Sequence, residues 1–244
     1  LSRLEGETSS DFTRVSTVFA LRGPDATGRG EDVTYDTVDQ EALLDADPDG
    51  DRFPLSGEYT LDSFSSMLDD LELFPTKEPD REASRHYRRW ALESAALDLA
   101  LRQTDETLAS ALGRNYDPVS FVVSTRLGEP PTTGRLEQAL EVHGDLAFKL
   151  DPTPEWTPAL AERVAGIAPV RILDLKGLYE GTEVDAEPDP DLYELVLETF
   201  PDAVVEDPAL TEETRPLFEG HESRVSWDYP ITGVGSVEDL PFEP

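Results

Sequence analysis

Hydrophobic and polar positions follow one pattern in the first half of the chain and another in the second. Residues 12–21 and 31–35 are rich in β-branched and aromatic side chains and flank a turn containing Gly and Asp, which predicts an antiparallel hairpin. Apolar residues then recur at helical spacing over 61–73 and over 82–102, whereas the acidic segment 41–54 is predicted to be a loop. The first half therefore predicts an α+β unit.

The segment 82–102 gives the clearest helical pattern in the chain. Its apolar positions recur at intervals of three and four residues, which predicts that one face of the helix is buried. The positions that make up this predicted face are Trp90, Leu92, Ala95, Ala96, Leu99 and Ala100.

From residue 118 onward, short apolar strands alternate with amphipathic helices. The predicted strands are 119–127, 146–150, 170–177, 203–208 and 224–230. The predicted helices between them are 135–143, 158–168, 191–200 and 212–220. Thr157-Pro158 and Asp189-Pro190 each supply an N-cap residue followed by a proline at the first helical position. This alternation predicts βαβ units and a parallel sheet, in a barrel or an open arrangement.

Charged residues stand at the ends of four of these predicted strands. They are Lys149, Asp151, Asp174, Lys176, Glu206 and Asp228. The carboxyl ends of parallel strands are where the active sites of α/β proteins form. Their spacing puts one acid on each of three consecutive strands, at Asp174, Glu206 and Asp228.

Three carboxylates on neighbouring strand ends repel one another unless a cation lies between them. Mg²⁺ suits such a set, because it prefers a few carboxylate oxygens together with water and substrate oxygens. The alternative is that each acid only caps the helix that follows it. The chain has three lysines, Lys77, Lys149 and Lys176, and two of them stand at these strand ends. A metal ion beside a lysine would favour the neutral amine, which can act as a general base.

The charge balance narrows the function classes further. The 244 residues include 53 acids and 20 bases, a formal net charge of −33, spread along the whole chain. At about 1 M salt the Debye length is roughly 3 Å, so the repulsion is screened, and we interpret the source as a halophile rather than an acidic mesophile. No basic stripe is present to bind nucleic acid.

The chain has no cysteine, no long apolar run and no signal-peptide pattern, so we expect a cytoplasmic protein without a membrane span.

The chain resembles the enolase superfamily, in particular its muconate-lactonising and mandelate-racemase-like branches. GRGEDVTY (28–35) resembles the hairpin of the capping domain, and ALESAALDLALRQTDETLASALG (91–113) resembles the alanine-rich helix that follows. VVEDP and VSWDYP resemble the segments that carry metal ligands on the fourth and fifth barrel strands. The resemblance implies an α+β capping domain at 1–117 and, at 118–244, the first five βα units of a TIM-type barrel, incomplete in this sequence.

The resemblance also implies a chemistry and its residues. Asp174, Glu206 and Asp228 match the Mg²⁺ ligands of the family, and Lys149 matches the first lysine of its Lys-x-Lys motif. Such enzymes abstract the proton α to the carboxylate of a small substrate, and the metal stabilises the enediolate. The expected partners are therefore a small carboxylate and, as an open option, a second copy of the chain.

Several positions depart from the family pattern. Asp151 stands in the place of the catalytic lysine, and Lys176 in that of an asparagine, while Tyr229 follows the fifth-strand acid where another acid is common. We hypothesise that the base has moved to Lys176, with Asp151 as its ion-pair partner. Only five barrel strands are predicted before Pro244, so we interpret the sequence as part of a longer protein. Two functions stay open: a lyase or isomerase (cycloisomerase, racemase, epimerase or dehydratase), or a diverged metal- or carboxylate-binding module without catalysis.

Overall fold

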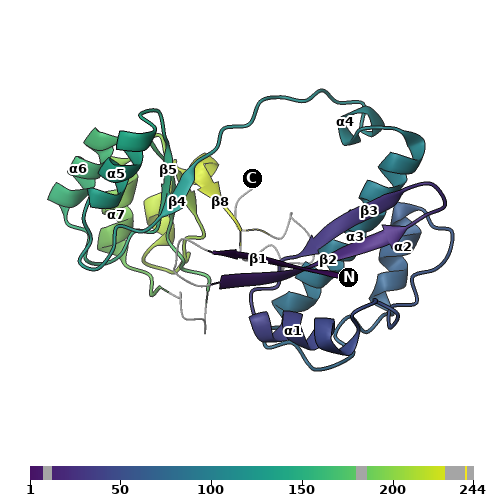
Figure 1. Cartoon of the computed structure of the whole chain (residues 1–244). Coiled ribbons are helices and arrows are strands. Elements are labelled where there is room, and N and C mark those ends of the chain that lie inside the picture. Colours follow the sequence, from purple (N-terminus) through teal and green to yellow (C-terminus); the bar gives the residue numbers. More distant parts are fainter. Residues whose placement is uncertain (8–12, 180–185, 229–239, 241–244) are drawn as a thin grey trace. The chain divides into compact units, whose positions relative to one another are not determined.

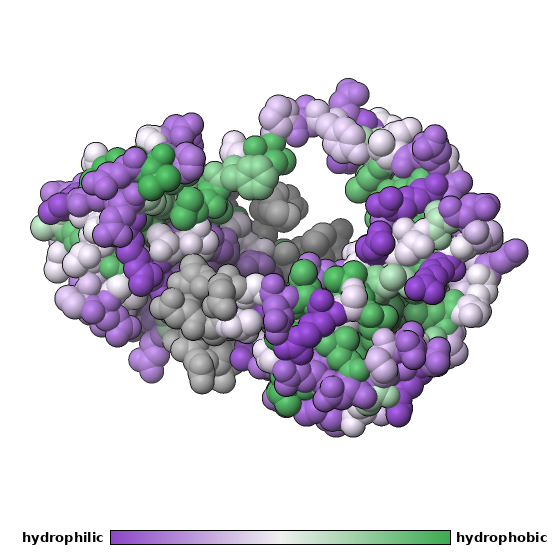
Figure 2. All heavy atoms as spheres, viewed as in Figure 1, coloured by the Kyte–Doolittle hydropathy of each residue, from purple (hydrophilic) through white to green (hydrophobic). Residues whose placement is uncertain are grey.

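The computed structural model of the protein describes residues 1–7, 13–179, 186–228 and 240. The chain divides into two units, Leu1–Pro118 and Val119–Pro244 (Figure 1). Hydrophilic side chains are spread over both units on the face drawn in Figure 2, as the scattered acids of the sequence predict. Among the described residues, no helix combines the length and the apolar character that a bilayer crossing requires.

The first unit contains a three-stranded antiparallel sheet in the order β1-β2-β3. The strands are β1 (Ser2–Glu7), β2 (Thr13–Arg22) and β3 (Thr27–Asp32). The predicted hairpin is confirmed as β2 and β3, whereas β1 was not expected, because its polar sequence lacks the alternation of a half-buried strand. Three of its residues, Arg3, Glu5 and Glu7, are charged, and the strand forms an outer edge of the sheet.

Helix α3 (Ala83–Thr104) packs against β3 at unusually short range. A Cβ atom built on Gly30 would lie 1.9 Å from the carbonyl oxygen of Ala91, and one on Gly28 would lie 2.1 Å from that of Ala95. Only glycine on the strand permits this approach, and the alanines of the helix keep the other side of the contact small. The Gly-x-Gly and alanine-rich segments are therefore a matched packing pair.

Three shorter helices complete the first unit, and one of them corrects the sequence analysis. They are α1 (Thr37–Ala46), α2 (Leu61–Asp69) and α4 (Leu108–Ala111). Helix α1 covers part of the acidic segment expected to be a loop. Its Leu43 is fully buried, and the amide of Gln40 donates to the carbonyl of Asp32 at 3.0 Å. These tertiary contacts outweigh the low apolar content of the segment.

The buried face of α3 differs from the predicted stripe. Trp90 is 47% exposed, because the buried positions run through Ser84, Arg88, Ala91, Leu92 and Ala95. Arg88 is itself buried: its guanidinium donates to the Asp32 carboxylate at 2.8 Å and lies 3.7 Å from the centroid of the Phe74 ring. Because Arg88 is polar, the apolar pattern of the sequence does not include it. The predicted stripe therefore passed through Trp90 instead.

The second unit contains five parallel strands in sequential order, β4-β5-β6-β7-β8. They are β4 (Val123–Thr125), β5 (Phe148–Leu150), β6 (Val170–Asp174), β7 (Val204–Glu206) and β8 (Val225–Ser226). Helices α5 (Gly134–Val142), α6 (Pro158–Ile167) and α7 (Pro190–Thr199) cover one face of this sheet (Figure 1). The predicted parallel sheet is confirmed, but the described residues do not form a complete barrel.

The helix boundaries of this unit follow the sequence signals closely. Thr157 and Asp189 accept hydrogen bonds from backbone N–H groups of the first turns of α6 and α7, and a proline follows each of them. The last expected helix, at 212–220, is wrong: η1 (Arg215–Phe218) is a short 3₁₀ turn, and η2 (Glu222–Arg224) follows. Pro216 removes a backbone donor there, so a longer helix is disfavoured.

Side-chain alternation along the strands separates the core from the site. Phe148, Leu150, Leu173 and Val205 are fully buried in the apolar core of this unit. Because successive strand residues point to opposite faces, Lys149, Asp174 and Glu206 share the other face of the sheet. The two-residue alternation of the strands therefore places apolar side chains in the core and charged side chains on the opposite face of the sheet.

Candidate metal centre

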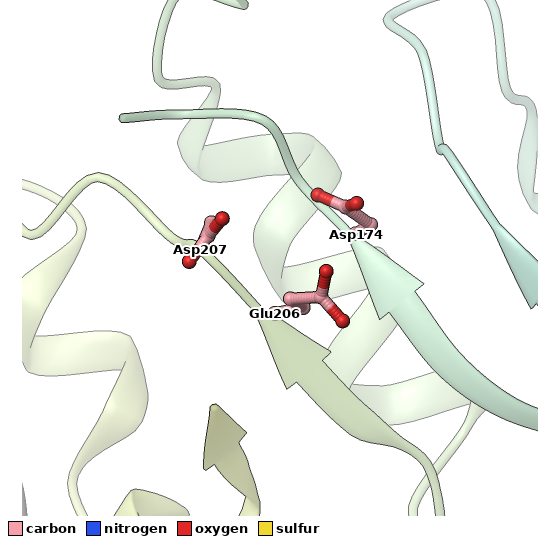
Figure 3. Close-up of side chains that lie close together, drawn as sticks. All are labelled: Asp174, Glu206 and Asp207. Atoms are coloured by element: carbon pink, nitrogen blue, oxygen red, sulfur yellow. The ribbon is translucent and has the colours of Figure 1, made fainter. Parts of the chain in front are cut away.

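Three buried carboxylates meet where β6 and β7 end (Figure 3). Asp174 and Glu206 are the last residues of the two strands and lie opposite each other in the parallel register. Asp207 follows directly after β7. One oxygen of each carboxylate lies within 4.8 Å of the others, and all three residues are buried. Two of the three, Asp174 and Glu206, are residues that the sequence analysis selected.

Asp207 was missed because of its backbone conformation. Consecutive residues of a strand point to opposite faces, so Glu206 and its neighbour were not expected together. Asp207 has a φ of 48°, in the left-handed region that non-glycine residues rarely adopt. This turn breaks the alternation and brings its carboxylate to the cluster (Figure 3). The one sequence signal was the acid pair in VVEDP, before a proline that ends the strand.

Asp228 lies beside the cluster in another role. Its side chain is exposed, and it is not among the three grouped carboxylates. Its backbone N–H donates to the Asp207 carboxylate at 2.8 Å, while the Asp207 N–H donates to the carbonyl of Ser226 at 3.0 Å. The end of β8 therefore orients Asp207. Tyr229, which the sequence analysis compared with the family pattern, lies outside the described residues.

Both lysines of this region are paired with the cluster. The Lys149 ammonium lies 3.0 Å from Asp174 Oδ2 and also donates to Glu206 Oε1. The Lys176 ammonium pairs with the same Asp174 Oδ2. Each lysine side chain is 18% exposed, so both ion pairs are largely shielded from solvent. The structure thus brings four of the six sequence-predicted residues into one network: Lys149, Asp174, Lys176 and Glu206.

Lys176 folds back onto its own strand because its backbone turns sharply. Its φ is 55°, and its N–H donates to Asp174 Oδ1 at 3.2 Å. The next residue, Gly177, permits a close approach: a Cβ atom there would lie 2.5 Å from the backbone nitrogen of Ala209. The N–H of Gly177 donates to the carbonyl of Asp207 at 3.0 Å. The segments that follow β6 and β7 therefore stay in contact and hydrogen-bonded after the strands end.

The expected pairing of Lys176 with Asp151 is wrong. Asp151 Oδ2 instead accepts from Arg126 Nε at 2.9 Å. The register explains this, because Thr125 lies opposite Leu150 at the ends of β4 and β5, so the residues that follow them are neighbours. The left-handed turn at Lys176 directs its ammonium to Asp174 instead.

Burial and charge shift the protonation equilibria of the cluster. Burial raises the pKa of Glu206 to about 7, and the charges of Asp174 and Asp228 add to this, while the Lys149 ammonium opposes it. Burial also raises the pKa of Asp174, but the hydrogen bond and charge of Lys176, with those of Lys149, outweigh it and leave the pKa below its usual value. Burial lowers the pKa of Lys149, yet its bonds to Glu206 and Asp174 raise it above its usual range overall.

The donor set fits a hard divalent cation. It consists of carboxylate oxygens alone, which Mg²⁺ and Ca²⁺ prefer, and offers no nitrogen or sulfur ligand of the kind zinc takes. The Lys149 ammonium between Asp174 and Glu206 marks a position that is favourable for positive charge. The arrangement is therefore suited to hold a cation.

Two family models together match almost the whole chain. The model described as the N-terminal domain of a domain of unknown function (DUF8230) matches residues 1–111. The model described as the C-terminal domain of DUF8230 matches residues 115–244. No curated protein matches the chain.

Solved structures with the same fold are members of the enolase superfamily. A probable mandelate racemase from Alicyclobacillus acidocaldarius is 15% identical, with a TM-score of 0.59 over 92% of this chain and 60% of its own. An enolase-superfamily protein from Listeria innocua is 15% identical, with a TM-score of 0.56 over 84% of this chain and 54% of its own. An enolase from Bradyrhizobium, complexed with magnesium and mandelic acid, is 13% identical, with a TM-score of 0.50 over 96% and 72%. The chain thus spans less than two thirds of the first two structures, and the likeness concerns the fold.

Proposed function

Because the chain belongs to the DUF8230 family and has a fold similar to that of enolase-superfamily chains, we propose that it is a Mg²⁺-dependent lyase or isomerase. It would abstract the proton α to the carboxylate of a small substrate. The observation that carries the proposal is the cluster of Asp174, Glu206 and Asp207 at the ends of two adjacent parallel strands. A similar fold occurs in the Bradyrhizobium enolase complexed with magnesium and mandelic acid.

The proposal assigns a role to each charged residue of the cluster. Asp174, Glu206 and Asp207 hold the ion, which supplies positive charge opposite the substrate carboxylate and so makes the α-proton more acidic. Asp228, the ligand expected from the sequence, orients Asp207 through its backbone. Lys149 is a positive charge rather than a base, because its raised pKa keeps it protonated while it is paired. Lys176 Nζ is the proposed proton acceptor. Its pair with Asp174 has to open and its ammonium has to lose a proton to water first, because only the neutral amine has a lone pair for the α-proton. Asp151, paired with Arg126, has no role in the proton transfer.

The proposal extends to the whole chain. Residues 1–117 would act as a capping domain and residues 118–244 as the first five βα units of a TIM-type barrel. The net charge of −33 supports function in concentrated salt, which in this proposal is the cytoplasm of a halophile. The proposed partner is the small carboxylate substrate. Nucleic acid is disfavoured as a partner by the same charge, and a homo-oligomer is compatible with it once salt screens the repulsion.

Exchange of the α-proton with solvent tests the proposed chemistry directly. The protein would be incubated in D₂O with Mg²⁺, potassium chloride and a panel of small carboxylic acids that includes mandelate. Mass spectrometry should detect deuterium at the α-carbon of at least one acid, and Lys176→Ala should abolish it. Full exchange by Lys176→Ala would refute the assignment of the base. No exchange into any acid, by a protein that binds Mg²⁺, would favour the second candidate function.

That second candidate is a metal- or carboxylate-binding module without catalysis. Two observations favour it: both lysines are ion-paired with the proposed ligands, and Asp151, where the family places a catalytic lysine, pairs with Arg126. Saturable binding of Mg²⁺, or of a carboxylate, without any proton exchange would be its signature.

A further inference from the structure

The Lys149 ammonium lies between two of the proposed metal ligands. It is 3.0 Å from Asp174 Oδ2 and donates to Glu206 Oε1. Asp174 also carries a second ammonium on the same oxygen, from Lys176, and a backbone N–H from that residue on its other oxygen at 3.2 Å. A cation held jointly by Asp174 and Glu206 would need the space and the lone pairs that Lys149 uses.

The two lysines differ in how firmly they are placed. The left-handed turn of its own backbone directs Lys176 toward Asp174, and its ammonium also lies 4.7 Å from the centroid of the Tyr179 ring. Lys149 has a regular strand backbone and a long flexible side chain that is 18% exposed, so its ammonium can move out to solvent. It is also the one of the two that bridges both carboxylates. Lys149 is therefore the group that a metal ion would replace.

We propose that divalent metal binding at this site is an exchange, in which the ion displaces the Lys149 ammonium from Asp174 and Glu206. This inference rests on the proposed function, because it takes the same carboxylates as ligands. In the metal-free protein, Lys149 neutralises the buried acids, since like charges this close destabilise each other in a medium of low dielectric constant. The metal affinity of the wild-type chain is then reduced by the ion pairs that must first break.

Substitution of Lys149 by methionine tests the exchange, because it removes the ammonium and keeps an unbranched side chain that is only one atom shorter. Mg²⁺ affinity would be measured by isothermal titration calorimetry at one fixed potassium chloride concentration. The exchange predicts binding tighter by on the order of tenfold or more, the scale of a modest coupling free energy. Lys77→Met is the matched control for net charge, since Lys77 bridges Asp39 and Asp80 in the first unit. It should leave the affinity unchanged.

A second control separates the bridging position from local charge. Lys176→Met removes a positive charge from the same cluster but not the bridge, so it should raise the affinity less than Lys149→Met does. The exchange is overturned if the Lys149 variant binds Mg²⁺ no more tightly than wild type, or no more tightly than the Lys176 variant. Tight binding by the Lys149 variant and none by wild type would support the exchange while refuting a Mg²⁺-dependent function. Binding by neither refutes both.

The wild-type chain offers a measurement that needs no variant. With three lysines in the sequence, acetylation by an amine-reactive reagent can be followed at each one by mass spectrometry. Saturating Mg²⁺ should speed modification of Lys149 several-fold, because the freed ammonium reaches solvent, and leave Lys77 unchanged. Slower or unchanged modification of Lys149, in a protein shown to bind the ion, would contradict the exchange.

Discussion

Replacing Glu206 by glutamine should change how the stability of the metal-free protein depends on pH. Burial raises the pKa of this carboxyl to about 7 in the folded chain, from a usual value of 4.5. Between these two values the folded state binds a proton that the unfolded state has released. The contribution of Glu206 to stability is therefore fully present below pH 4.5 and is lost as the pH rises through 7. Glutamine does not titrate, so the variant lacks this loss.

The size of the stability loss follows from the difference between the two pKa values of Glu206. From 4.5 to about 7, at about 1.4 kcal/mol for each pH unit, the loss amounts to about 3 kcal/mol. Glu206 is only 7% exposed, so solvent screens little of this. A change of that size is a large fraction of the free energy of unfolding of a typical domain, about 5–15 kcal/mol.

Urea denaturation measures this difference, because urea is uncharged and leaves the ionic strength constant during unfolding. Wild type, Glu206→Gln and the control Glu141→Gln, an exposed glutamate on α5, would be unfolded in EDTA and potassium chloride at a series of pH values from 4.5 to 8. The free energy of unfolding of wild type should fall by about 3 kcal/mol relative to Glu206→Gln across this range. The control should run parallel to wild type. A constant difference between wild type and Glu206→Gln would refute the reasoning about burial.

Three further substitutions test separate parts of the structure. Asp207→Asn should weaken Mg²⁺ binding measured by calorimetry much more than Asp228→Asn does, and the reverse order would show that the exposed acid is the ligand. Gly177→Ala should lower the free energy of unfolding by about 1–3 kcal/mol, because its Cβ would lie 2.5 Å from a backbone nitrogen. Gly166→Ala, where a Cβ meets nothing within 4 Å, is its control and should not destabilise. Arg88→Met should cost about 3–5 kcal/mol in thermal or urea unfolding by leaving its buried carboxylate partner unpaired, and a loss below about 1 kcal/mol would contradict that.

The parallel sheet and two of the three clustered carboxylates could be predicted from the sequence. Alternating strands and helices indicate βαβ units, and acids at strand ends indicate a site, so Asp174 and Glu206 followed from periodicity alone. Their facing positions at the ends of β6 and β7 confirm that reasoning. The N-caps at Thr157 and Asp189 were equally local signals and are confirmed.

The rest depended on backbone conformations and contacts that leave little trace in a single sequence. Asp207 joins the cluster, and Lys176 turns onto its own strand, through left-handed conformations that no pattern of apolar residues encodes. Helix α1 forms in an acidic segment because Leu43 and Gln40 find partners in the sheet. Trp90 was placed in the core because Arg88, the residue that is buried, is of a type that is rarely buried.

A titration of the wild-type chain with Mg²⁺ tests the central claim most directly. The experiment would use isothermal titration calorimetry in concentrated potassium chloride, which suppresses unspecific binding to the acidic surface. The account predicts saturable binding of one ion per chain, lost in Glu206→Gln and retained in the exposed control Glu141→Gln. Absence of saturable binding by wild type, or equal binding by Glu206→Gln, would contradict it.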